Sequence, residues 1–416
     1  MKQIRHPAWI LIFILAIIVV FTGYANKPGT PPADNNTSQP PVSPKPAANK
    51  EKATLYFSDD QAMYLTPEIR EISYQGNNLP LAIVEELVRG PAVKEHSPTL
   101  PKTTRVLSLE VQNGTAYVNL SKDFERDYPG GTTGEAMALG SIVKSLTELK
   151  NIYAIQFLIE GKKVEVLAKG HAEISRPLER SIALGTLEQS KENLEKAQKK
   201  ADAGQLEWRL DPLETARKEG PLHGLYVNGE YKLISKEEKG TYSGTGEALV
   251  RHTYKGSTYD IKLIQPVKSG KGGIWAINSI MPFGTQEEAI TGFLENRFLQ
   301  PNFGGKVFSA YEILGKKNYD ARIVLYIWAY CQEYVKESGK LQEKTGVSLP
   351  LALTLYAQDE NHNQVIDYRQ PEDGKGYTPS IKRIFPSDIQ DKITARQGKV
   401  SELEQKARLK AENYFK

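Results

Sequence analysis

The sequence of 416 residues contains only one cysteine, Cys331. A single cysteine cannot form an intramolecular disulfide, a cysteine zinc site or an iron–sulfur cluster. Its neighbours in LYIWAYCQEYV are mostly apolar, so we expect Cys331 to be a small buried side chain rather than a reactive thiol. The chain also has little net charge, because 54 Lys and Arg against 50 Asp and Glu give +4. This balance does not indicate nucleic-acid binding.

Motifs of catalysis are also absent from the sequence. The six histidines show no HExxH or other metal-ligand spacing, and there is no G-x-S-x-G elbow, P-loop or dinucleotide fingerprint. Asp359, Asn361, Asn363 and Asp367 alternate as in the first part of a calcium loop, but glutamine stands where that loop needs glycine and glutamate. We interpret this segment as a polar hairpin turn. The sequence therefore predicts no catalytic residue, no metal ligand and no cofactor.

A long uncharged run is present near the N-terminus. Lys2 and Arg5 precede Ala8–Tyr24, AWILIFILAIIVVFTGY, which is just long enough to span a bilayer. Positive residues before the run predict that the chain after it lies outside the cytoplasm. Residues 1–25 are therefore either an uncleaved membrane anchor or a signal sequence cut after Ala25, and the protein is membrane-anchored or secreted. Tyr24 stands where a lipobox would carry its lipidated cysteine.

Residues 26–52 follow as a Pro-rich linker. The segment NKPGTPPADNNTSQPPVSPKPAANK is nearly free of large apolar residues, so it cannot bury enough surface to fold. Its prolines favour an extended chain of about 3 Å per residue. We expect a spacer that holds a folded domain away from a membrane.

Residues 53–181 are predicted to form an α+β domain. ATLYFSD reads as a strand and LPLAIVEELVRGP as a helix that ends at Gly90-Pro91, followed by a hairpin, a second helix in GTTGEAMALGSIVKSLTELKN and a second hairpin around Gly161-Lys162. This order predicts a small, mostly antiparallel sheet with both helices on one face.

The first hairpin has the clearest local pattern in the chain. VLSLEVQNGTAYVNLSKDF places Asn113-Gly114 between two alternating runs, and a two-residue turn needs positive φ at both positions. The turn also fixes the register, since a slip of one residue would exchange the two faces. We expect Tyr117 and Asn119 to point outward as a candidate interaction surface. The expected core face consists of Leu107, Leu109, Val111, Ala116, Val118 and Leu120.

This segment resembles the GerMN domain, a module of sporulation and spore germination. The resemblance runs in order through LYFSDD, LTPEIREI, LVRGP, LPKTTRVLSLEVQNGTAYVNLSKDF, GEAMALGSIVKSLTEL, IQFLIEG and GHAEISRPLER, and it covers about the whole domain. It implies an extracytoplasmic, noncatalytic α+β module, similar to the ring-building domains of sporulation channel proteins. Members are usually lipoproteins and often carry two such modules, whereas this chain has Tyr24 and one module. Glu68 and Arg70 within LTPEIREI read as a turn cap or a solvated surface pair, with a ligand-binding pair as the alternative.

The remaining chain divides into three parts. We predict a charged linking helix in 182–206, a small α+β domain in 207–283 and a C-terminal α+β domain in 284–416. Asp211-Pro212 predicts a capped helix start, followed by a meander of strands with Trp208 and Trp275 in its core. In the last part, TQEEAITGFLENRFL reads as a helix, IVLYIWAYCQEYV as a helix or a buried strand, and Ile389–Phe415 as one charged helix.

The sequence thus favours a noncatalytic extracytoplasmic envelope protein that acts in sporulation or spore germination. Its GerMN-like domain is expected to mediate assembly or envelope binding, through self-association or through envelope proteins, with peptidoglycan as a further candidate and the membrane contacted by the N-terminal segment. Two alternatives stay open. One is a peptidoglycan-modifying enzyme in the C-terminal half, and the other is a sensor ectodomain that partners a wall enzyme.

Overall fold

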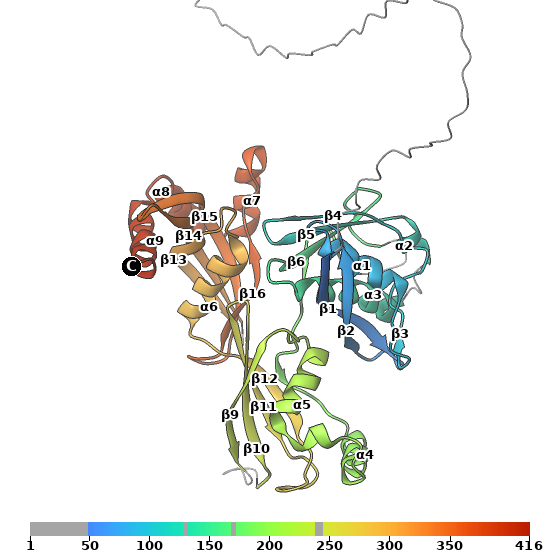
Figure 1. The fold of residues 1–416 in the computed structure, drawn as a ribbon. Coiled ribbons are helices and arrows are strands. Elements are labelled where there is room, and N and C mark those ends of the chain that lie inside the picture. The colour runs from blue at the N-terminus through green and yellow to red at the C-terminus, as the bar shows by residue number, and fades with distance from the viewer. Residues whose placement is uncertain (1–48, 128–130, 168–171, 238–243, 321) are drawn as a thin grey trace, which may run out of the picture. The chain divides into compact units, whose positions relative to one another are not determined.

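The computed structural model describes residues 49–127, 131–167, 172–237, 244–320 and 322–416. These residues form a mixed α+β structure (Figure 1), which confirms the α+β part of the predicted fold class. The expected anchor or signal sequence at 1–25 lies outside the described residues, as does most of the linker at 26–52. Within the described ranges, no helix has the length and apolarity needed to cross a membrane.

The first region contains two sheets instead of the single sheet that we predicted. Their strand orders are β2-β1-β3 and β4-β5-β6-β7. Strand β1 begins inside the segment predicted as linker, because its antiparallel pairing with β2 extends to Asn49 opposite Tyr74. The elements are β1 Asn49–Asp59, β2 Leu65–Tyr74, α1 Leu79–Arg89, β3 His96–Ser97, β4 Val106–Gln112, β5 Thr115–Leu120, α2 Asp123–Asp127, α3 Gly131–Thr147, β6 Ala154–Ile159 and β7 Leu178–Glu179.

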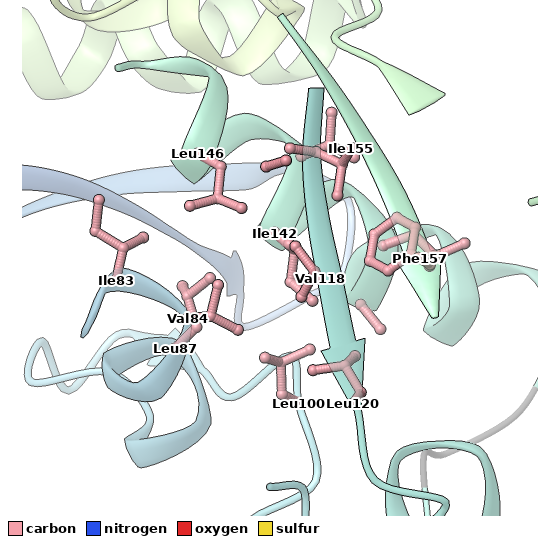
Figure 2. Packing of buried hydrophobic residues seen from close by; sticks show 14 of the residues in the cluster. Ile83, Val84, Leu87, Leu100, Val118, Leu120, Ile142, Leu146, Ile155 and Phe157 are labelled. Carbon is pink, nitrogen blue, oxygen red and sulfur yellow. The ribbon is translucent and has the colours of Figure 1, made fainter. Parts of the chain in front are cut away.

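Helices α1 and α3 share one hydrophobic core with strands of both sheets (Figure 2). Ile83 and Leu87 of α1 lie one turn apart and are fully buried, as are Ile142 and Leu146 of α3. Full burial of such a side chain contributes about 1.5–3 kcal/mol. Helix α1 ends at Gly90, whose φ of 98° suits glycine alone.

The predicted second hairpin, around Gly161-Lys162, is correct at its turn but wrong at its second strand. After β6 the chain turns at Glu160-Gly161 and forms isolated bridges between Ile159 and Lys162 and between Val166 and Glu173. Strand β6 pairs in parallel with β5, and its other edge is occupied by β7. A parallel pair needs a long crossover, which α3 supplies here. The turn at Gly161 therefore forms, but strands from elsewhere in the sequence occupy both edges of β6, so the expected second strand is not formed.

The predicted core face of β4 is correct at Leu109 and Val111 but wrong at Leu107. The register between β4 and β5 shifts between Val106 and Ser108. This irregularity leaves Leu107 41% exposed, while Val106 packs against the core in its place. On β5, the expected core residues Ala116, Val118 and Leu120 are fully buried.

The second region is a meander covered by short helices, as the alternating runs indicated. Asp211 caps α5, its side chain accepting a hydrogen bond from the backbone N–H of Glu214, with Pro212 at the first helical position. Trp275 is 1% exposed, whereas Trp208 is half-buried beneath Arg209 and Lys218. The sheet has the order β8-β12-β11-β10-β9. The elements are β8 Gly185–Thr186, α4 Lys191–Asp202, a 3-10 turn Glu207–Leu210, α5 Pro212–Glu219, a 3-10 turn Gly220–His223, β9 Glu230–Glu237, β10 Glu247–Tyr254, β11 Ser257–Ile264 and β12 Ala276–Pro282.

The helix expected between the first two regions is α4, and it is not a free linker. Its Ala197 and Ala201 are buried against Ile274, which directly precedes Trp275. Strand β8, which lies before α4 in the chain, pairs with β12. Both elements therefore belong to the meander rather than to a separate connection.

The third region is a sheet of order β13-β14-β15-β16 with helices on both faces. Cys331 is fully buried in β14, as predicted, and burial raises the pKa of its thiol. Figure 1 shows α8 and α9 beside β13 and β14. The elements are α6 Gln286–Phe293, a π-helical turn Leu294–Phe298, β13 Lys306–Tyr319, β14 Arg322–Glu337, β15 Lys340–Ala357, β16 Asn363–Arg369, a 3-10 turn Gly374–Gly376, α7 Tyr377–Ile384, α8 Ser387–Arg396 and α9 Ser401–Tyr414.

The single C-terminal helix predicted at Ile389–Phe415 is instead two helices. The chain leaves α8 after Arg396 and passes through Gly398 at a φ of 77° before α9 begins. Leu403, Ala407 and other apolar residues of α9 pack on one face of the sheet. The break lets both helices lie against the sheet, which one straight charged helix would not allow.

Candidate functional site

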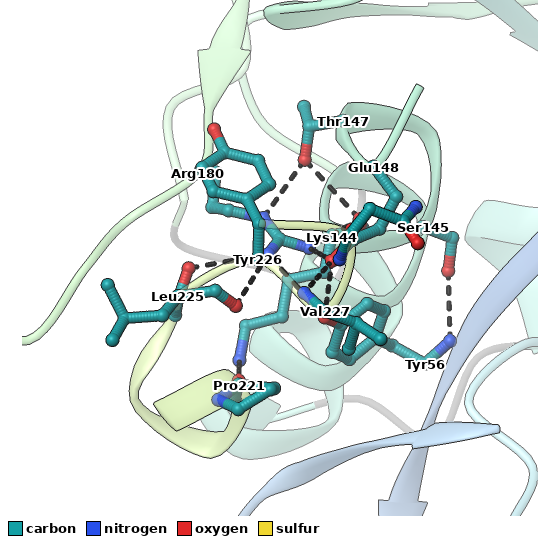
Figure 3. A network of polar contacts seen from close by, with 12 residues as sticks. Tyr56, Lys144, Ser145, Thr147, Glu148, Arg180, Pro221, Leu225, Tyr226 and Val227 are labelled. Carbon is teal, nitrogen blue, oxygen red and sulfur yellow. Dashed lines mark hydrogen bonds and ion pairs between the residues drawn. The ribbon is translucent and has the colours of Figure 1, made fainter. Parts of the chain in front are cut away.

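A buried ion pair lies between the end of α3 and the chain after β7 (Figure 3). Arg180 Nη2 is 3.0 Å from Glu148 Oε1, and the two side chains are 1% and 2% exposed. Glu148 directly follows α3, and Arg180 directly follows β7. Such a buried pair is costly to desolvate unless further hydrogen bonds satisfy both groups.

The carboxylate of Glu148 receives hydrogen bonds from three more donors. The hydroxyl of Tyr56 donates to Oε1 over 2.7 Å, and the backbone N–H of Val227 over 3.1 Å. The backbone N–H of Asn228 donates to Oε2 over 3.2 Å. Glu148 therefore ties β1 and the chain before β9 to the end of α3.

The guanidinium of Arg180 is enclosed in the same way. It donates to the backbone oxygens of Leu225 at 2.9 Å, Gly224 at 3.3 Å and Lys144 at 2.6 Å. The rings of Tyr56 and Tyr226 lie on it, with centroids 5.0 and 4.3 Å from its Cζ atom. Arg180 thus binds backbone of the first and second regions at once.

Two lysines complete this junction of the first two regions. Lys144 Nζ donates to the backbone oxygen of Pro221 over 3.2 Å, and burial, followed by repulsion from Arg180, lowers its pKa to about 7. Lys255 Nζ donates to the backbone oxygens of Thr147 and Ile152 over 2.6 and 2.5 Å. Burial and then Arg180 likewise lower the pKa of Lys255 to about 7, against the attraction of Glu148. Near neutral pH, each amine is thus able to gain or lose a proton.

Lys255 reaches α3 because of an unusual turn. Lys255 and Gly256 connect β10 to β11, with φ of 51° and 75°. Glycine or asparagine normally occupies such positions, so lysine in this conformation carries strain of about 1 kcal/mol or more. Its contacts with the end of α3 and with the rings of Tyr153, Tyr226 and Tyr254, at 4.7, 5.3 and 5.5 Å, offset that cost.

The turn and surface residues singled out from the sequence lie elsewhere in the first region. Asn113 and Gly114 connect β4 to β5 with φ of 48° and 73°. Tyr117 and Asn119 are half-buried on β5, on the face opposite the core. Asn119 Oδ1 accepts a hydrogen bond from the backbone N–H of Gly161 over 2.7 Å. Asn119 thus holds the turn after β6.

Glu68 and Arg70 form a partly buried structural contact, so the expected turn cap is present and the alternative of a solvated surface pair is wrong. Glu68 is 7% exposed, and its carboxylate accepts hydrogen bonds from Arg70 and from the backbone N–H groups of Ala92 and Val93. Burial raises the pKa of Glu68, but these hydrogen bonds outweigh it and hold the pKa below its usual value. The pair fixes the chain after α1 against β2.

The alternating polar segment near Asp359 is the turn between β15 and β16, as we interpreted it. Asp359 accepts hydrogen bonds from Asn361 and His362, and the buried amide of Asn363 donates to the backbone oxygen of Gly284 over 3.2 Å. Across the described part of the chain, no group of three or more His, Cys, Asp or Glu residues is arranged to hold a metal ion.

The junction residues were not predicted from the sequence. Glu148 and Arg180 lie in segments that resemble the family, but nothing near them indicates that their partners are at 221–228. Lys255 carried the only local sign, since a Lys-Gly pair between two alternating runs predicts a two-residue turn with lysine in a rare conformation.

Comparison with known proteins identifies the first region. Residues 54–165 match the model of the Germane family, described as sporulation and spore germination. The first GerMN domain of the sporulation protein GerM from Bacillus subtilis is 21% identical, with 31% of this chain and 98% of that chain covered and a TM-score of 0.28. The tandem GerMN domains of the same protein are 14% identical, with 67% and 78% covered and a TM-score of 0.29. The curated proteins give no significant match.

Proposed function

We propose, from the match of residues 54–165 to the Germane family, that the protein is a noncatalytic, exported envelope protein of sporulation or spore germination. The family match carries the proposal, since the family is described by these two processes. In this proposal the Germane domain mediates assembly with envelope proteins or with a second copy of the chain, and peptidoglycan is a further ligand.

The junction supports a structural role for the buried charges. The two oxygens of Glu148 receive four donors, and Arg180 is bound to it and to three backbone oxygens. Neither group can exchange a proton with a substrate unless these bonds break. Their arrangement fits a scaffold that fixes one region against the next.

The N-terminal sequence supports export. Lys2 and Arg5 precede the uncharged run Ala8–Tyr24, so the proposal places residues 47–416 outside the cytoplasm. Protease added to intact, wall-stripped cells should digest the chain beyond Asn26. Complete protection while the membrane is unbroken would contradict export.

Tyr117 is the side chain with which to test assembly. It lies on the face of β5 away from the core, beside Glu110 of β4 and Gln156 of β6. Tyr117→Ala should leave the melting temperature nearly unchanged and weaken self-association or capture of envelope proteins, measured by sedimentation of the full chain across concentration. Tyr319→Ala is a matched control, because Tyr319 is 49% exposed at the end of β13.

Two outcomes would contradict the proposal. A full chain that stays monomeric at high concentration, and retains neither peptidoglycan nor an envelope protein, would remove the assembly and binding roles. Sustained release of soluble peptidoglycan fragments, abolished by one Asp or Glu substitution, would show that the protein is an enzyme.

A further inference from the structure

A cavity of about 480 Å³ lies beside the junction and is lined by all three regions. Its volume is within the range of roughly 300–1,000 Å³ that is typical of small-molecule sites. Aromatic side chains form much of its wall. They are Tyr153 before β6, Tyr226 before β9, Tyr254 at the end of β10, Tyr259 in β11 and Tyr356 in β15.

The tyrosines offer ring faces without negative charge. The rings of Tyr226 and Tyr254 lie with their centroids 4.7 Å apart and their planes tilted by 42°. Burial, followed by the nearby charge of Glu148, raises the pKa of Tyr254 to about 12, so its phenol stays neutral at physiological pH. Such faces bind the apolar face of a ring.

The charged groups of the cavity wall are mostly basic. They include four cations, Arg180, Lys255, Arg297 and Arg322, and one carboxylate, Glu179. Glu179 is paired with Arg297, and Arg180 is paired with Glu148. Among the described residues, neither Lys255 nor Arg322 forms an ion pair. A ligand with a negative charge would supply the missing partner.

The cavity also contains a buried amide that is only half satisfied. Gln364 Nε2 donates to the hydroxyl of Tyr259 over 2.5 Å, while its Oε1 is buried without a hydrogen-bond partner. A buried polar atom without a partner costs about 1–3 kcal/mol. A ligand hydroxyl or N–H group that reached Oε1 would remove this cost.

A ligand that matches this cavity would combine an apolar ring face, a negative charge and a hydroxyl or N–H donor. We propose that this cavity binds an acidic saccharide of the cell wall, with its ring on Tyr226 and Tyr254, its carboxylate at Lys255 and Arg322, and a hydroxyl or N–H group at Gln364. The inference rests on the proposed function, because it assigns envelope binding to a particular ligand and place. It also gives the second and third regions a role, since each supplies part of the wall.

Calorimetric titration of the full chain tests this site. The probe is a soluble muropeptide that carries carboxylates, with the neutral trimer of N-acetylglucosamine and inorganic phosphate as comparisons. Arg322→Gln should weaken muropeptide binding about tenfold, as expected for loss of one charge-assisted contact. Arg322 is exposed, so this variant should fold normally. Arg105→Gln is the matched control, because Arg105 is 72% exposed and lies outside the cavity.

A second variant, Lys255→Met, should weaken binding at least as strongly, with thermal melts recording any loss of folding. Binding of the neutral trimer should be at least about tenfold weaker than that of the muropeptide. Equal muropeptide affinity in the original chain and in Arg322→Gln would overturn the inference, as would binding of phosphate alone as tight as that of the muropeptide. If the chain still retained intact peptidoglycan in either case, envelope binding would stand and only this site would be refuted.

Discussion

Replacing Glu148 by glutamine tests whether the buried junction contributes to stability. Glutamine has nearly the same shape, but it removes the negative charge and puts an NH2 group opposite at least one hydrogen-bond donor, since Oε1 receives three donors and Oε2 receives one. Arg180, 1% exposed, would then be buried without a counter-charge. Breaking such a pair typically costs about 3–5 kcal/mol.

We expect the loss of unfolding free energy to be near the lower end of that range, because Arg180 would keep its other contacts. In the variant, the guanidinium would still donate hydrogen bonds to the backbone oxygens of Lys144, Gly224 and Leu225. It would also still contact the rings of Tyr56 and Tyr226. We therefore expect Glu148→Gln to lower the free energy of unfolding by about 3 kcal/mol.

Urea denaturation followed by tryptophan fluorescence measures this loss, and hydrogen exchange adds a local reading. The amides of Val227 and Asn228 donate to Glu148, so their protection should fall in the variant. Glu71→Gln is the control, because Glu71 pairs with Lys50 on the surface, where the two side chains are 57% and 63% exposed. Glu71→Gln should lower the free energy of unfolding by less than about 1 kcal/mol. If the two variants unfold at the same urea concentration and Val227 stays protected, the junction does not hold the regions together.

Two further substitutions probe the turn in the first region and the histidine behind the junction. Gly114→Val should lower the free energy of unfolding by about 1–3 kcal/mol, because φ is 73° at this position and an added Cβ would lie 3.1 Å from Gln300 and Tyr153. An unchanged thermal melt would contradict this prediction. Burial, then repulsion from Arg180, lowers the pKa of His252 to about 4 from the usual 6.5, so the unfolded chain binds more protons between these values. Stability should therefore fall by about 2–3 kcal/mol as pH drops from 6.5 to 4, and urea titrations should show that His252→Gln lacks this part of the fall.

The sequence predicted elements whose patterns are local. The meander β9–β12 alternates along each strand, and the cap at Asp211 acts within one helical turn. The stretch that became β14 stayed ambiguous for a physical reason. Residues such as Ile327 face α6 while Trp328 faces α7–α9, so both faces are apolar and the period of two is lost.

Features that depend on distant residues were missed or misjudged. Nothing near Gly161 indicates that β5 and β7 occupy both edges of β6. The exposure of Leu107 follows from a shift in register, which alternation alone does not reveal. The same reason applies to the junction, because Glu148 and Arg180 are 32 residues apart and their partners Leu225, Val227 and Asn228 join them only when the first two regions pack.

A comparison of two of the turns with positive φ, Asn113-Gly114 and Lys255-Gly256, shows how a local conflict can locate a site. Asn113-Gly114 has residues that suit its conformation, and its geometry needs no further explanation. Lys255-Gly256 adopts the same kind of turn with a residue that does not suit it. Asparagine would reduce the strain, but its short side chain could not reach the oxygens of Thr147 and Ile152. The lysine is therefore explained by its contacts beyond the turn, and those contacts lie where α3, the junction and the tyrosine-lined cavity meet.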